Sequence, residues 1–181
     1  MAQEDVLGGG GSVVPSAAAI LTPPNGLQQI LATFGDIYEY VQTDGSLDPR
    51  WQADFLARAT LPFALKLSWD PATIVTQMTC HKRLVDVFTE VFERIATGGL
   101  QEKTQTFGGC FSFRPQRNAS KMSAHAWGIA IDLNTATNAQ GSVGDMDAGI
   151  VEIFRAAGFT WGGDWAGARR DPMHFQFCTG Y

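Results

Sequence analysis

The sequence lacks several features that would define a functional class by themselves. No apolar run approaches the roughly 20 residues needed to span a bilayer, so membrane insertion is not expected. Basic residues are few, since 13 Lys and Arg stand against 18 Asp and Glu, which gives a formal net charge of −5 and a pI near 5.0. Nucleic-acid binding requires clustered cations. The sequence has no such cluster, and we expect no nucleic-acid partner.

Cysteine is also scarce. Cys80, Cys110 and Cys178 form neither an even-numbered framework nor a CxxC metal motif, so at most one disulfide is possible. We expect reduced, partly buried thiols. A catalytic Cys–His pair is the weaker alternative, because nothing around these cysteines marks a nucleophile.

The N-terminal segment does not resemble a structured element. Its first residues, MAQEDVLGGGG, contain neither the basic nor the apolar region of a secretory signal, which predicts a chain made in the cytoplasm. Residues 1–21 are rich in Gly, Ala and Ser and are expected to form a flexible arm. The length of residues 22–181 suits one folded domain, and we expect a monomer.

Apolar periodicity predicts an α+β fold. The clearest helix spans residues 81–97, where apolar residues recur at spacings of three and four, with His81 at its start as a surface or capping residue. A small antiparallel sheet, with helices packed against it, is expected from the remaining segments. Further helices are predicted at 27–34 and 147–157, and strands at 61–69, 108–113, 127–133 and 173–178.

Two of the predicted strands carry polar side chains opposite an apolar face. In WGIAIDLN, Asp132 points away from Ile131 and its apolar neighbours, and in MHFQFC, His174 points away from Phe175. If the two strands are neighbours, Asp132 and His174 converge on one point. His125, before the loop-forming Gly128, can fold back to the same point.

Two imidazoles and one carboxylate are a common hydrolytic zinc site. His125, Asp132 and His174 would leave a fourth position for a water, whose pKa the metal lowers to about 7. Asp171, three residues before His174, can act as the general base. A positive group must also face the developing oxyanion, and either Arg114 or Arg117 could serve.

Each of these residues also has a simpler interpretation. Taken alone, His174 could be a hydrogen-bonded core histidine, and Asp132 a buried carboxylate that needs a partner. Asp171 alone could be a turn residue before a proline.

Three further acidic residues have ordinary structural interpretations. Asp145 and Asp147 could suggest calcium, but helix capping fits better because EF-hand spacing is absent. Asp164 is most simply a turn residue that orders the loop of the site.

Several segments are similar to a known peptidase family. SAHAWGIAID (123–132) resembles the S-x-H-x-x-G-x-A-x-D motif of the zinc D-alanyl-D-alanine carboxypeptidases and L-alanyl-D-glutamate endopeptidases (VanY-like peptidases). DPMHF (171–175) resembles the closing acid-x-x-H motif of that family. CHKRL (80–84), GGCFSFRPQR (108–117) and GFTWGGDW (158–165) resemble its bacteriophage lysis branch, so the likeness covers roughly residues 22–178.

The resemblance implies a zinc enzyme that hydrolyses the stem peptides of peptidoglycan, with the fold shared by DD-peptidases and hedgehog domains. Residues 22–181 would then be the catalytic domain. By position, His125, Asp132 and His174 match the metal ligands and Asp171 the catalytic acid. Ser123 matches the motif serine, and Arg114 and Arg117 fall where the family places an arginine that contacts the substrate or transition state.

The resemblance favours a phage endolysin that cuts the L-alanyl-D-glutamate bond. Such an enzyme would leave the host cytoplasm through a holin-type lesion and act on the wall, in the periplasm or outside the cell. Three alternatives remain open: a D-alanyl-D-alanine carboxypeptidase, a non-catalytic module that binds cell wall, and a virion component carrying a wall-degrading domain. No separate wall-binding domain is evident in the sequence.

Overall fold

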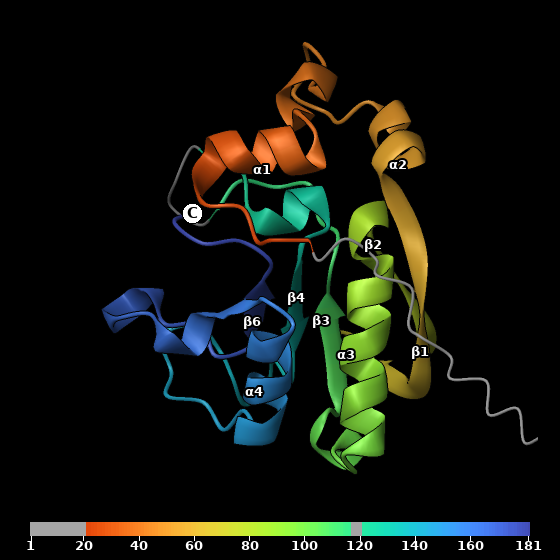
Figure 1. Ribbon diagram of the computed structural model, residues 1–181, viewed down its shortest axis with the longest axis vertical. Coiled ribbons are helices and arrows are strands. Elements are labelled where there is room, and N and C mark those ends of the chain that lie inside the picture. The colour runs from red at the N-terminus through yellow and green to blue at the C-terminus, as the bar shows by residue number, and fades with distance from the viewer. Residues whose placement is uncertain (1–20, 117–120) are drawn as a thin grey trace, which may run out of the picture.

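The computed structural model describes residues 21–116 and 121–181. The predicted flexible arm lies outside these residues apart from Leu21, and the domain boundary at residue 22 stays a prediction. The described residues form an α+β fold with four α-helices and one six-stranded sheet (Figure 1), as the sequence predicts. No helix among them is long and apolar enough to cross a membrane.

The elements alternate along the chain between helices, strands and short 3-10 turns. The helices are α1 (Gly26–Phe34), α2 (Pro49–Phe55), α3 (Val85–Thr97) and α4 (Ala148–Ala156). The strands are β1 (Leu56–Leu67), β2 (Ile74–His81), β3 (Thr106–Gly109), β4 (Ala130–Leu133), β5 (Thr160–Trp161) and β6 (His174–Gln176). The 3-10 turns are η1 (Ile37–Tyr40), η2 (Lys82–Leu84), η3 (Gln101–Lys103), η4 (Ala124–Trp127), η5 (Gly162–Asp164) and η6 (Gly167–Arg169).

The sheet is mostly antiparallel. Its strand order is β2-β1-β3-β4-β6-β5, and only the pairing of β1 with β3 is parallel. The strands β4 and β6, which carry Asp132 and His174, are therefore neighbours, with β3 on one flank and β5 on the other.

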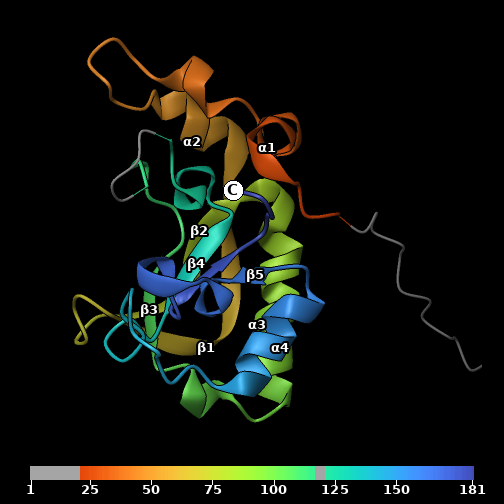
Figure 2. The same ribbon diagram turned by 90° about the vertical axis from the view of Figure 1, so that its left-hand side faces the viewer.

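Helices α3 and α4 pack on one face of the sheet (Figures 1 and 2). The predicted apolar stripe of α3 is buried, as Phe88 and Phe92 show. On α4, Phe154 stacks on Phe175 of β6, with ring centroids 4.2 Å apart. Because side chains alternate along a strand, the neighbours of Phe175 in β6 face away from the helices, and His174 is one of them.

Helix α1 closes the end of the fold near η4. Its end at Gly35 is explained by the positive φ of 96° at that residue, a conformation that glycine adopts readily. The indole N–H of Trp127, in η4, donates to the Gly35 carbonyl oxygen at 3.0 Å. The Asn25 side chain does not cap α1. Instead, the Asn25 backbone N–H donates to Gln29 Oε1 at 2.8 Å.

Some elements differ from the sequence-based prediction. Strand β1 ends at Leu67, so Trp69 lies in the following turn with 65% of its surface exposed, and does not continue the strand. Strand β2 and helix α2 were not predicted. The first half of β2, residues 74–77, is largely exposed at the edge of the sheet, and only the second half is buried, so the strand lacks the regular apolar alternation that indicates a half-buried strand in a sequence.

The three cysteines are unpaired and buried, as predicted. Burial raises the pKa of Cys80 to about 12 and that of Cys178 to about 12, and also raises the pKa of Cys110. Because the thiolate is the nucleophilic form, these pKa values argue against the alternative of a catalytic cysteine.

The acidic residues before α4 have structural partners. Asp147 caps α4, accepting from the Gly149 backbone N–H at 2.8 Å, as predicted. Asp145 does not cap a helix. Its carboxylate accepts from the side-chain amide of Asn138 at 2.8 Å.

His81 is buried, which contradicts a surface position. Its Nδ1 accepts from the Arg83 backbone N–H at 3.2 Å, so the predicted capping role is confirmed. Its Nε2 lies 3.0 Å from the Phe34 carbonyl oxygen, to which it donates. Burial lowers the pKa of His81 to about 4, because desolvation disfavours the charged imidazolium.

We expect His81 to make the protein less stable in mild acid. Between pH 6.5 and about 4, the unfolded chain binds a proton at His81 that the folded chain does not bind. The free energy of unfolding therefore falls as the pH is lowered through this window, by up to about 3 kcal/mol from this residue. Urea unfolding across pH 4–7 should show a shallower decline for His81→Gln, and equal slopes in both proteins would contradict the assignment.

Candidate metal centre and active site

The antiparallel register of β4 and β6 aligns two of the predicted ligands. Asp132 pairs directly with His174, which confirms that the two strands are neighbours. His125 arrives from η4, where the Ser123 hydroxyl accepts from the His125 backbone N–H at 3.4 Å.

Gly128 turns the chain from η4 into β4. Its φ of 69° is left-handed, and a Cβ at this position would lie 2.8 Å from the His81 backbone nitrogen. Only glycine combines this conformation with this close approach. The chain can therefore return within seven residues from His125 to Asp132.

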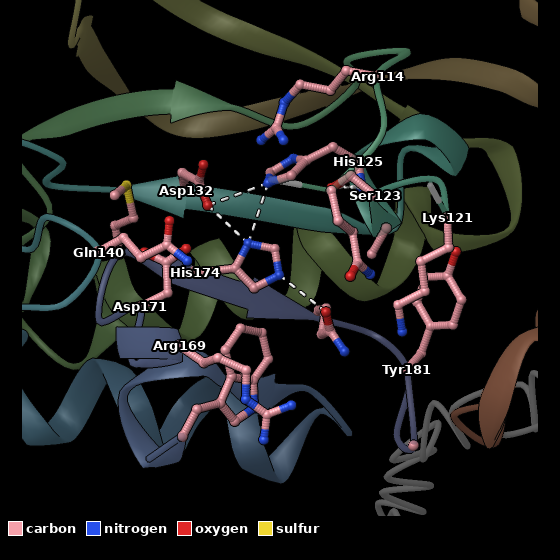
Figure 3. Close-up of a pocket in the computed structure, with 16 residues that line it drawn as sticks. Arg114, Lys121, Ser123, His125, Asp132, Gln140, Arg169, Asp171, His174 and Tyr181 are labelled. Carbon is pink, nitrogen blue, oxygen red and sulfur yellow. Dashed lines mark hydrogen bonds and ion pairs between the residues drawn. The ribbon is translucent and has the colours of Figure 1, made fainter. Parts of the chain in front are cut away.

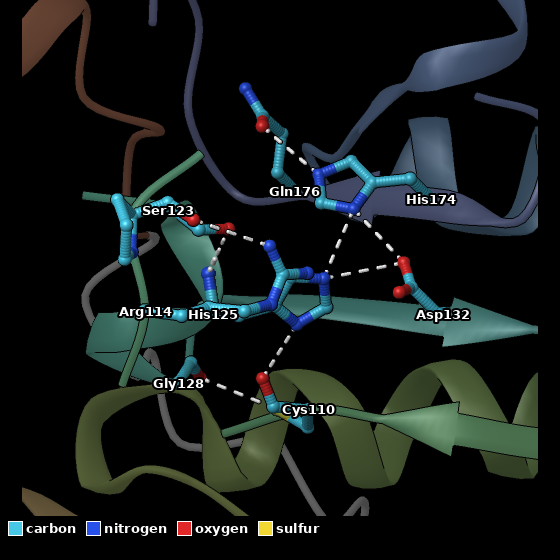
Figure 4. A network of polar contacts seen from close by, with 9 residues as sticks. Cys110, Arg114, Ser123, His125, Gly128, Asp132, His174 and Gln176 are labelled. Carbon is cyan, nitrogen blue, oxygen red and sulfur yellow. Dashed lines mark hydrogen bonds and ion pairs between the residues drawn. The ribbon is translucent and has the colours of Figure 1, made fainter. Parts of the chain in front are cut away.

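The three side chains meet at one point (Figure 4). His174 Nδ1 lies 3.0 Å from Asp132 Oδ1, His125 Nε2 lies 3.3 Å from the same oxygen, and the two ring nitrogens lie 3.2 Å apart. The two imidazoles are buried and Asp132 is half-buried.

In each histidine, the ring nitrogen that points away from the centre (the outer nitrogen) determines whether the nitrogen that faces the centre (the inner nitrogen) carries a hydrogen. His125 Nδ1 lies 2.7 Å from the Cys110 carbonyl oxygen, and His174 Nε2 lies 3.1 Å from Gln176 Oε1. Both oxygens can only accept, so both outer nitrogens carry a hydrogen. In the neutral rings, His125 Nε2 and His174 Nδ1 then present lone pairs toward each other and toward the Asp132 carboxylate.

Three facing lone pairs repel one another unless a cation lies between them. Zinc ligands at about 2.0–2.1 Å in a tetrahedron lie about 3.3 Å from each other, close to the separations of 3.0–3.3 Å found here. Hydrogen bonds from the outer ring nitrogens are also typical of metal-bound histidines. The donor set of His125, Asp132 and His174 therefore fits a zinc ion.

Electrostatics favour the ionised state of Asp132. Burial by itself raises the pKa of this carboxyl, but when the imidazoles are protonated, the charge of His125 and hydrogen bonds from both histidines outweigh burial and hold the pKa well below its usual range. Burial lowers the pKa of His174, yet its hydrogen bond with Asp132 leaves that pKa raised. A positive charge among the three groups, either a proton on an imidazole or a metal ion, therefore stabilises the Asp132 carboxylate.

Asp171 lies at the rim of this centre. It lines the same pocket as the three ligand residues, and its backbone carbonyl accepts from the His174 N–H at 3.0 Å. The Asp171 N–H donates to the Gly162 carbonyl oxygen at 2.9 Å, which closes the loop between β5 and β6. A Cβ at Gly162 would lie 2.5 Å from the Asp171 carbonyl oxygen, so glycine permits this closure.

An ion pair also anchors that loop to α4. The Arg155 guanidinium contacts both carboxylate oxygens of Asp164 at 2.7 and 2.8 Å and also Glu152 at 2.6 Å. The Trp161 indole N–H donates to the Pro172 carbonyl oxygen at 2.8 Å. Asp164 thus does order the loop, as the sequence suggested, but through an ion pair.

The pocket has a volume of about 540 Å³ (Figure 3), within the range of small-molecule sites. Arg114 lines it beside His125, whereas Arg117 lies outside the described residues. The lining residues are Arg114, Gln116, Lys121, Ser123, Ala124, His125, Asp132, Gln140, Trp165, Arg169, Asp171, Met173, His174, Gln176, Gly180 and Tyr181.

Several residues of the site were not predicted from the sequence. Gln176 was visible as the residue that shares a strand face with His174, and that spacing could have suggested a partner for the ring. Trp165, whose ring centroid lies 5.5 Å from that of His174, and Arg169 lie in a loop without periodicity, so no sequence signal indicated that they reach the pocket.

A comparison with known protein families also points to a hydrolytic enzyme. Residues 117–177, about a third of the chain, match a family described as D-alanyl-D-alanine carboxypeptidase. The match supports a peptidase. The matched segment contains all three candidate ligands and Asp171. A comparison with curated proteins finds no match.

We expect the chain to bind one zinc ion through this centre. His125→Ala and His174→Ala should abolish tight binding, because each removes a ligand atom. Gln176→Leu should weaken the affinity by roughly 10- to 100-fold, since the partner that orients His174 is lost. Competition with a chromogenic chelator measures these affinities. His81→Gln, at the third histidine, is the control, and zinc lost equally from all four variants would refute the site.

Removal of the ion pair between Arg155 and Asp164 should affect catalysis more than stability. Asp164→Asn removes an exposed ion pair, which contributes about 1 kcal/mol or less, but frees the loop that carries Asp171. We expect kcat/KM for peptide hydrolysis to fall by roughly tenfold, with zinc affinity unchanged. Glu152→Gln removes the other partner of Arg155, which does not belong to the loop. Equal effects of the two substitutions would contradict a role in positioning the loop.

Proposed function

We propose that the protein is a zinc metallopeptidase that hydrolyses peptide bonds in peptidoglycan stem peptides. The observation that carries the proposal is the set of three facing lone-pair atoms, 3.0–3.3 Å apart, at the base of an open pocket that Asp171 also lines. The match of residues 117–177 to a D-alanyl-D-alanine carboxypeptidase family supports the substrate class.

His125, Asp132 and His174 would hold the zinc ion. A zinc ion bound there would lower the pKa of a coordinated water to about 7 and polarise the scissile carbonyl group. The hydrogen bonds to the Cys110 carbonyl and to Gln176 place the hydrogen of each neutral ring on its outer nitrogen, so that the nitrogen facing the centre has a lone pair for a metal ion.

Asp171 and Arg114 carry the remaining roles in this proposal. The Asp171 carboxylate accepts the proton of the attacking water and delivers it to the leaving amine. Arg114 enters the pocket from the segment between β3 and η4 and donates to the carbonyl oxygen as negative charge develops on it. Arg117 belongs to the same segment, and its role remains the prediction made from the sequence.

Within this class, we propose an L-alanyl-D-glutamate endopeptidase of the phage endolysin type. The support is the similarity of residues 80–84, 108–117 and 158–165 to that branch. The second candidate is a D-alanyl-D-alanine carboxypeptidase, which the description of the matched family favours. Both activities hydrolyse a peptide bond with the same catalytic groups, and they differ in which bond of the stem peptide is cut.

Asp171→Asn should separate catalysis from metal binding. We expect zinc affinity to be retained and kcat to fall by about 10²-fold or more, because the variant cannot accept the proton. Asp86→Asn, an exposed carboxylate on α3, is the matched control and should leave kcat unchanged. Loss of zinc from Asp171→Asn would instead identify Asp171 as a ligand.

Mass spectrometry of the products from purified peptidoglycan tests the proposed bond. A new amino-terminal D-glutamate identifies the endopeptidase, and release of one terminal D-alanine identifies the carboxypeptidase. A digest with chelator is the control. If the zinc-loaded protein releases no product from the wall, the peptidase proposal fails and the non-catalytic module becomes the better explanation.

A further inference from the structure

Arg169 differs from the other arginines of the protein. Within residues 21–116 and 121–181, every other arginine has a hydrogen bond or ion pair with the protein, whereas the Arg169 guanidinium has none. An arginine is always charged and offers five donors in a plane. Arg169 therefore presents an unused set of donors.

The backbone around Arg169 is nevertheless anchored. The Arg170 N–H donates to the Gly167 carbonyl oxygen at 3.1 Å and closes η6, and the Arg170 carbonyl accepts from the Gly141 N–H at 2.7 Å. The Arg170 Nε also donates to the Trp165 carbonyl oxygen at 3.5 Å. These contacts fix the point from which the Arg169 side chain leaves the chain.

Arg169 lines the pocket on the side opposite Arg114. Figure 3 shows the two side chains on either side of His125, Asp132 and His174. The topology agrees, because Arg114 follows β3 and Arg169 follows β5, the strands that flank the central pair β4 and β6. A substrate lying across the metal centre therefore meets a cation at each side.

The charge of this pocket is opposite in sign to that of the whole chain. Its charged lining groups are Arg114, Lys121 and Arg169 against Asp132 and Asp171, although the net charge of the protein is −5. Asp132 is held by the two histidines, and Lys121 lies over the Tyr181 ring, 4.3 Å from its centroid. Arg169 is exposed and has no such contact with the protein, and its positive potential attracts anions.

We propose that Arg169 forms a subsite for a carboxylate of an acidic peptide substrate, on the side of the scissile bond away from Arg114. The planar guanidinium matches a carboxylate in a two-point hydrogen bond. The inference rests on the proposed peptidase function and narrows it to peptides with a carboxylate near the scissile bond. That carboxylate can be an internal α-carboxylate or side-chain carboxylate, or the carboxyl terminus of the peptide.

Synthetic stem peptides test this subsite. The parent peptide, a peptide amidated at its internal carboxylate and a peptide amidated at its carboxyl terminus are compared as substrates. We expect one amidation to raise KM for the wild-type protein by roughly tenfold, as expected for loss of a charged hydrogen bond. The affected peptide identifies the source of the carboxylate. Equal KM values for all three peptides would overturn the proposal.

Substitutions at Arg169 test whether this side chain causes the discrimination between the peptides. Arg169→Gln should raise KM for the parent peptide by about tenfold with little change in kcat, and should lose the discrimination against the amidated peptide. Arg169→Lys, which keeps the charge without the planar pair of donors, should lie between the two. Arg94→Gln, an exposed arginine of α3, is the control for the change of net charge. Discrimination that persists in Arg169→Gln would overturn the subsite.

Failure of the peptidase proposal can be separated from failure of the subsite. If wild-type protein cuts none of the peptides, their binding is measured by calorimetry, with Arg169→Gln beside it. Weaker binding of the parent peptide by Arg169→Gln alone would support the subsite in a non-catalytic protein. Equal binding by both proteins would refute it.

Discussion

The candidate centre depends first on the pairing of β4 with β6. These two short strands bring Asp132 and His174 into direct opposition, and the apolar residues on their other face pack under α4. A shift of one residue in this register would place Asp132 and His174 on opposite faces of the sheet, and would turn one of them toward the helices. Burial of Ile131, Leu133 and Phe175 therefore enforces the arrangement of the polar groups. The chemistry of one face is stabilised by hydrophobic packing on the other.

The sequence predicted the parts of the site that have a periodic or spaced signal. Asp132 and His174 could be placed because each lies on the polar side of a strand whose alternate residues are apolar. Helices α3 and α4 could be placed because their apolar stripes are regular. Strand β2, whose first half is largely exposed at the sheet edge, and β5, with two residues, carry no such signal. His81 was misplaced because its partner, the Phe34 carbonyl oxygen, lies 47 residues away. Arg169 was missed because only the closure of its loop brings it to the pocket.

The pocket has a base built on paired strands and a 3-10 turn, and walls made by loops. The base consists of side chains from β4, β6 and η4, whereas Arg114, Trp165 and Arg169 arrive on connections at either flank. Loops tolerate changes in sequence more readily than paired strands do. In this arrangement, the groups that would select a substrate can vary without disturbing the groups that would hold a metal. Under the proposed function, this separation would allow the bond that is cut to change while the metal centre is kept.

The two histidines of the centre are supported in different ways. The outer nitrogen of His125 donates to the main-chain carbonyl of residue 110, whereas that of His174 donates to the side chain of Gln176. No substitution at position 110 deletes a carbonyl group, so the first support is protected against mutation as long as the backbone keeps its course. The second support can be exchanged by a single codon change. Engineering of metal affinity through these supports would therefore act on Gln176 of β6, whereas the support of His125 is set by the main chain.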